Sequence, residues 1–102
     1  MGVDLEQDPT FFDRADSHIH LANEHCSNVG RGKVSASFMY GCARFQAWNA
    51  ACWADNIASM KASRQETVDY FVGQYRVMLE EHLDDYIEKF DEYMQAKDAG
   101  TT

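Results

Sequence analysis

The sequence predicts an all-α protein, a three-helix bundle with helices over about residues 9–28, 36–60 and 64–97. Three observations favour this fold class. Apolar residues recur at three- and four-residue spacing, and helix-start signals precede each apolar stripe. One proline and six glycines leave few breaks in 102 residues, which favours a few long elements.

The first helix begins within the segment EQDPTFF. Asp8 is a good N-cap and Pro9 a good first helical residue, because the backbone N–H that proline lacks would be unpaired there anyway. The helix ends near Asn28, where NVGRGK supplies turn residues. Its apolar stripe follows helical spacing and consists of Phe11, Phe12, Ala15, Ile19, Ala22 and Cys26.

The second helix is capped at Ser35 and is apolar around most of its circumference. A helix with so narrow a polar face is expected to be buried, with its cysteines as small core residues. One face is a smooth ridge of Ala43, Ala47, Ala50, Ala54 and Ala58. The opposite face is bulky and holds Phe38, Cys42, Phe45, Cys52 and Trp53.

The third helix begins at a capping box, in which Ser63 and Glu66 each satisfy a free backbone N–H. At 1.5 Å per residue a helix ending near Lys97 would be about 50 Å long, which exceeds the other two. Its end must therefore overhang, bend or pack on a second copy. The core stripe consists of Val68, Val72, Tyr75, Leu79, Leu83, Tyr86, Phe90 and Tyr93.

Composition excludes several classes of protein. A net charge of −8 argues against unspecific binding to nucleic acid or to anionic membranes. No apolar run approaches the ~20 residues that span a bilayer, and the acidic start MGVDLEQDP lacks the features of a signal peptide. Three cysteines without a CxxC pair do not form a disulfide framework. We therefore expect a cytoplasmic protein with a single helical domain over 9–97, between disordered tails at 1–8 and 98–102.

The stretch DSHIHLANEHC concentrates residues of the metal-ligand type. His18 and His25 fall on one flank of the apolar stripe, about 10 Å apart along the helix axis. His20 falls on the far side, one turn from Asp16 and one turn from Glu24. The three histidines do not converge, and the Glu-x-x-His pairs of di-iron bundles are absent from the sequence. An ordinary helix with a solvated polar face explains this pattern best.

Two surfaces on the third helix are candidates for partner binding. Tyr70 and Val77 lie opposite the core stripe, and Gly73 between them would let another backbone approach closely. This side of the helix is a candidate homodimer interface. Glu80, Asp84 and Glu88 form an acidic face, for which a solvated surface is the simplest explanation. Their carboxylates repel one another at four-residue spacing, and a basic protein partner or divalent cations would relieve that repulsion.

Four runs of the sequence resemble the small proteobacterial proteins of domain-of-unknown-function family 3144. These runs are DPTFFDRADSHIHLANEH, RGKVSAS, ARFQAW and YFVGQYRVMLEEHLDDYIEKFDEYM, and the resemblance extends from about Pro9 to Met94. It implies a bacterial, cytosolic, helical protein. It implies no activity, cofactor or functional residue.

Two hypotheses follow, and the function itself stays unknown at this level. The favoured one is a non-catalytic helical interaction protein without a cofactor, which self-associates through the Tyr70–Val77 side. The alternative is a metal- or small-ligand-binding protein, conceivably an enzyme. There, His82 at the edge of the third helix's stripe would meet His18, His25 and a cysteine between helices.

Overall fold

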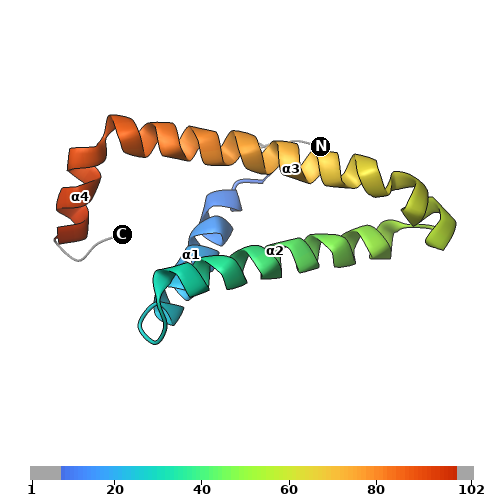
Figure 1. The fold of residues 1–102 in the computed structure, drawn as a ribbon, viewed down its shortest axis with the longest axis horizontal. Helices are drawn as coiled ribbons and strands as arrows, with labels where there is room; N and C mark the ends of the chain where they lie inside the picture. The colour runs from blue at the N-terminus through green and yellow to red at the C-terminus, as the bar shows by residue number, and fades with distance from the viewer. Residues whose placement is uncertain (1–7, 99–102) are drawn as a thin grey trace. The chain divides into compact units, whose positions relative to one another are not determined.

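The computed structural model describes residues 8–98, and every regular element among these residues is helical. The all-α class that the sequence predicts is therefore confirmed, whereas the described residues form four helices and the prediction of three is wrong. The predicted disordered tails lie outside the described residues, except for Asp8 and Asp98. In chain order the helices are α1, Phe11–His25; α2, Arg31–Trp53; α3, Ile57–Glu88; and α4, Phe90–Asp98 (Figure 1).

The chain divides into two compact units, residues 1–52 and residues 53–102. The first unit holds α1 and α2, and the second holds α3 and α4. No helix among residues 8–98 is long and apolar enough to cross a membrane.

Polar side chains hold the start of α1. The Arg14 guanidinium donates to the Asp8 carboxylate at 2.5 Å and to the Thr10 hydroxyl at 2.7 Å. Asp8 was predicted to be the N-cap of this helix, but Thr10 occupies that position. Asp8 instead forms an ion pair with Arg14. At the other end the helix stops at His25, and the Ser27 hydroxyl donates to the carbonyl of Glu24 at 2.7 Å.

The predicted bounds of the second helix are both wrong. Val34 N–H donates to the carbonyl of Gly30, so GRGK forms the first turn of α2 and is not a loop before it. The helix ends at Trp53, and Asn56 is the N-cap of the next helix, α3. The Asn56 side chain accepts from Ser59 N–H at 2.9 Å, and the Ser59 hydroxyl accepts from Asn56 N–H at 3.2 Å. This reciprocal capping box starts α3.

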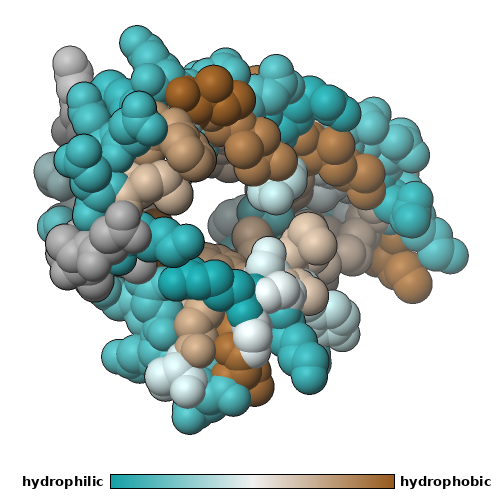
Figure 2. All heavy atoms as spheres, turned by 60° about the vertical axis from the view of Figure 1, so that its left-hand side comes forward, coloured by the Kyte–Doolittle hydropathy of each residue, from teal (hydrophilic) through white to brown (hydrophobic). Residues whose placement is uncertain are grey.

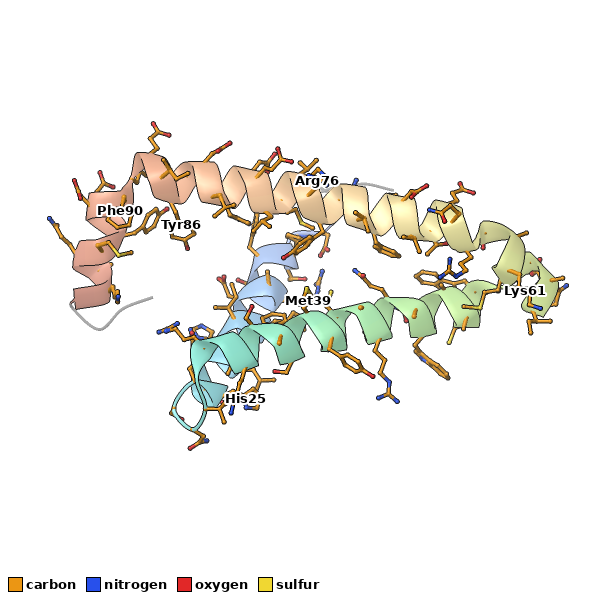
Figure 3. All side chains as sticks on the ribbon, viewed as in Figure 1. His25, Met39, Lys61, Arg76, Tyr86 and Phe90 are labelled. Carbon is orange, nitrogen blue, oxygen red and sulfur yellow. The ribbon has the colours of Figure 1, made fainter. Side chains whose placement is uncertain are left out.

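The predicted start and end of the third helix also differ from the structure. Ser63 lies inside α3, where its hydroxyl donates to the carbonyl of Met60, so the capping box predicted there is wrong. At the other end Lys89 leaves helical geometry, and α4 turns away from α3 (Figure 1). The Tyr93 hydroxyl donates to the Asp85 carboxylate at 2.5 Å, and the rings of Tyr86 and Tyr93 lie 4.4 Å apart. The third helix therefore bends; Figure 3 labels Tyr86 before the bend and Phe90 after it.

Few apolar side chains are buried. Val34, 5% exposed, is the one buried hydrophobic residue within 8–98. The expected burial of α2 is not found, since Phe45 is 65% exposed and Trp48 66% exposed. Cys42 and Cys52 are exposed too, and the prediction that they are core residues is wrong. Figure 2 shows hydrophobic residues, in brown, at the molecular surface among hydrophilic ones.

Candidate functional site

A groove of about 790 Å³ lies between α1 and α2, within the first unit. One face of α1 forms one wall, through Arg14, His18, Leu21, Ala22 and His25. One face of α2 forms the other wall, through Val34, Ser37, Phe38, Gly41, Cys42 and Phe45. On each helix the lining residues are spaced three or four positions apart, apart from a few neighbouring pairs. This spacing places each set on one side of its helix.

The walls of the groove are mainly apolar and open to solvent. Leu21 on α1 is 52% exposed, and Phe38 on α2 is 43% exposed. The buried residue Val34 also lines the groove. A concave surface with mainly apolar walls is typical of a binding site.

The ionisable side chains that line the groove are basic, apart from the thiol of Cys42. They are Arg14, His18 and His25, and the lining includes no carboxylate although the protein carries a net charge of −8. The guanidinium of Arg14 already forms an ion pair with the Asp8 carboxylate. The groove therefore combines apolar walls with the imidazoles of His18 and His25, whereas Arg14 already donates to Asp8 and Thr10.

The structure places the four candidate histidines at three different sites. His18 and His25 both line the groove, opposite Cys42. His20 is exposed on α1 and is not a lining residue, and His82 belongs to α3 in the second unit. Within the part of the chain that the structure describes, no group of three or more His, Cys, Asp or Glu side chains is placed to hold a metal ion.

The apolar side chains of α3 are exposed on two sides. On the predicted interface side, Val77 is 54% exposed, and a Cβ added at Gly73 would meet no described atom within 4 Å. Tyr70 is half-buried, with its ring 5.2 Å from that of Phe71. The sequence interpretation missed the other side, because it assigned those residues to the core. We call it the α3 stripe; it consists of Val68, Val72, Tyr75, Leu79 and Leu83, all exposed.

The family model described as "Protein of unknown function (DUF3144)" matches residues 11–87. The chain belongs to the DUF3144 family. It is also similar to a protein of Shewanella sp., NB7890A, whose NMR structure gives a TM-score of 0.72 at 40% sequence identity. That match covers 84% of this chain and 92% of the Shewanella chain. No curated protein matches the chain.

The matched region of this DUF3144 protein contains every residue that lines the groove, and all of α3 except Glu88. The resemblance predicted from the sequence is thus confirmed. The family description assigns no function, so the role of each surface must be argued from its own chemistry.

The acidic face of this DUF3144 protein lies along the second half of α3. Glu80, Asp84 and Glu88 are exposed, and neither ion pair found within residues 8–98 includes them. Their neighbour Asp85 differs, because the hydrogen bond from Tyr93 lowers the pKa of its carboxyl, and the charge of Lys89 adds to the effect. The same hydrogen bond raises the pKa of the Tyr93 hydroxyl.

Proposed function

We propose that this DUF3144 protein is a non-catalytic helical interaction protein of the bacterial cytoplasm that self-associates as a homodimer. The supporting observation is the exposure of its large apolar side chains, with Val34 as the one buried hydrophobic residue within 8–98. Monomeric soluble proteins rarely leave extensive contiguous apolar surface in water. A second copy would cover it, and the single helical domain predicted over 9–97 would complete its bundle only in the dimer.

Association requires apolar burial that outweighs its entropic cost. Each large apolar side chain moved from water into an interface contributes about 1.5–3 kcal/mol. Association costs about 4–15 kcal/mol in lost translational and rotational freedom. Val68, Val72 and Tyr75 of α3 are 42%, 54% and 54% exposed, so each would contribute about half of that value, and many such side chains from both copies are needed to offset the cost.

The contact surface that we propose between the two copies is the Tyr70–Val77 side of α3. The exposure of Val77 and the open space at Gly73 support it, because a glycine without neighbours lets a second backbone come close. The neighbouring acidic face, Glu80 to Glu88, would serve a basic protein partner. Neither surface requires a cofactor.

Native mass spectrometry of the untagged protein, purified without added metal, tests the proposal. A dimer at the mass of two bare chains is expected. A monomer at micromolar concentration contradicts self-association. Sedimentation equilibrium over a range of concentrations then gives the dissociation constant of the dimer, which the variants below require.

The alternative function, binding of a metal or small ligand, has one supporting observation. His18, His25 and Cys42 line the same groove, although within residues 8–98 they are not placed to hold one metal ion together, and His82, the fourth residue of that hypothesis, belongs to the other unit. The same mass spectrum tests it, because a bound metal or metabolite adds stoichiometric mass. Replacing His18 or His25 would then remove that mass while the helical circular dichroism is retained.

A further inference from the structure

We propose that the junction between α3 and α4 is a conformational switch with a bent and a straight state. In the bent state, which the structure shows, the hydrogen bond from the Tyr93 hydroxyl to the Asp85 carboxylate holds α4 away from the axis of α3 (Figure 1). When that bond is released, α3, Lys89 and α4 join into one helix from Ile57 to Asp98. The switch lies within one chain and does not depend on self-association.

The backbone at the junction is close to that of an uninterrupted helix. Lys89, with φ −111° and ψ 28°, is the one residue between the two helices. Its N–H donates to the carbonyl of Asp85 at 3.0 Å, and its carbonyl accepts from Tyr93 N–H at 3.1 Å. Both are bonds to the fourth residue back, as in a continuous α-helix. A backbone change centred on Lys89 would therefore straighten the chain.

Side chains, and not the backbone, select the bent state. Sharp bends in helices usually occur at proline, at glycine or where a side chain interrupts the backbone hydrogen bonds. The one proline is Pro9, and no glycine lies between Gly73 and Gly100. A continuous helix would separate Asp85 from Tyr93 by about 12 Å along its axis, too far for the hydrogen bond that joins their side chains. The contact exists only when the helix is bent, so it stabilises that state.

The two states differ in the length of the apolar stripe on α3. Val72, Leu79, Tyr86 and Tyr93 recur every seven residues, so their spacing continues across the junction. Apolar residues with this repeat lie along one side of a helix. In the straight state the α3 stripe would therefore extend to Tyr93, whereas in the bent state the ring of Tyr93 lies 4.4 Å from that of Tyr86. The switch thus sets the length of apolar surface that α3 presents.

Pulsed electron paramagnetic resonance on the full chain distinguishes the two states. Spin labels are attached at Lys61→Cys and Lys97→Cys, both exposed positions, in a background with Cys26→Ser, Cys42→Ser and Cys52→Ser. A straight helix would separate the two labelled positions by about 54 Å, and a bent one by less. An excess of unlabelled protein keeps the measured distances within one chain.

Three variants remove the contact in steps. Tyr86→Phe is the matched control, because it removes a hydroxyl from the other ring of the pair and leaves the Tyr93–Asp85 hydrogen bond in place. It should keep the wild-type distribution, with its single shorter distance. Tyr93→Phe removes the hydrogen bond and should produce a second population at the longer distance. Tyr93→Ala removes the ring as well and should make that population the major one. Because α4 would then be the end of a longer helix, and helix ends fray, its amides should exchange faster.

A wild-type distribution in both Tyr93 variants would overturn the proposal, because the bend would then not depend on this contact. A broad distribution with a loss of helical circular dichroism would also overturn it, since release would unfold α4 instead of straightening the chain. So would a wild-type protein that already shows the longer distance. Since the labelled chains are diluted, each outcome reads the same in a monomer and in a dimer, and a failure of self-association would leave the switch standing.

Discussion

The bend between α3 and α4 differs from the groove between α1 and α2 in whether its side chains find partners. At the bend, the Asp85 carboxylate accepts from the Tyr93 hydroxyl and lies 3.5 Å from the Lys89 ammonium. Side chains of the same chain therefore satisfy it. At the groove, the apolar side chains of Phe38 and Phe45 are 43% and 65% exposed within the first unit.

Because of this difference, we expect mutations at the bend to change the stability of the chain and mutations on the open apolar surfaces to change its association. A bend that is satisfied within one chain should respond to mutation locally, without a change in oligomeric state. Apolar surfaces left open by one chain should respond through the dissociation constant of the dimer. Each variant below tests that separation.

Val77→Glu should have the largest effect. Placing a carboxylate in an apolar contact costs several kcal/mol unless it finds a partner, so we expect a loss of about 2–4 kcal/mol in association free energy. The protein should become monomeric at micromolar concentration by sedimentation equilibrium. Gln95→Glu, which adds the same charge on exposed α4, is the matched control and should remain dimeric. Equal behaviour of the two variants would remove Val77 from the interface.

Gly73→Ala sharpens the comparison because its two possible effects have opposite signs. In an isolated helix, alanine should raise the free energy of unfolding by about 1 kcal/mol, since a Cβ there meets no described atom within 4 Å. In a dimer with a close backbone at Gly73, the same Cβ should raise the dissociation constant. We expect both, measured by urea unfolding and by sedimentation. A dimer that is strengthened instead would place this side of α3 in solvent.

The sequence was sufficient for the fold class but not for the helix ends. Periodic apolar residues predict helices whatever their tertiary surroundings, and this prediction is confirmed. The box of Asn56 and Ser59 was missed because its N3 position holds serine in place of the more usual Glu or Gln. The bend at Lys89 was also missed, because no glycine or proline near Lys89 marks it in the sequence. The Tyr93 hydroxyl donates to Asp85 across this turn.

The candidate site was predictable only in part, for a physical reason. Helix geometry alone puts His18 and His25 on one flank of α1, and both line the groove. That Cys42 lies opposite them depends on how α2 packs, which no spacing within one helix encodes. The apolar α2 was expected to be buried, because an apolar helix favours burial. Hydropathy does not say whether the same chain or another molecule buries it.

Neutralising the acidic face should have a smaller effect, confined to helix stability. The triple variant Glu80→Gln, Asp84→Asn, Glu88→Gln removes two like-charge pairs at four-residue spacing, each worth about 0.2–0.5 kcal/mol. The free energy of unfolding at low salt should rise by a few tenths of a kcal/mol, and the gain should shrink in high salt. The dimer dissociation constant should stay near that of the wild type. A large loss of dimer would instead place this face in the interface.

The smallest effect is expected at the bend, from pH. The pKa of Asp85 is lowered from 3.8, so its contribution to stability is present above 3.8 and is lost as pH falls through the lowered value. The pKa of Tyr93 is raised from 10.0, so its contribution is complete below 10.0 and is lost as pH rises through the raised value. Between those limits the bend should be insensitive to pH.

Tyr93→Phe tests this assignment, because it removes the hydroxyl and retains the ring against Tyr86. The pKa of Asp85, followed through its carboxyl carbon by NMR, should move back toward 3.8, and amide exchange should quicken in α4 alone. The residual lowering would then come mainly from Lys89, and Lys89→Gln should remove it. Because both variants act within one chain, the dimer dissociation constant should not change. If it does, the bend belongs to the interface, and the contrast with the groove no longer holds.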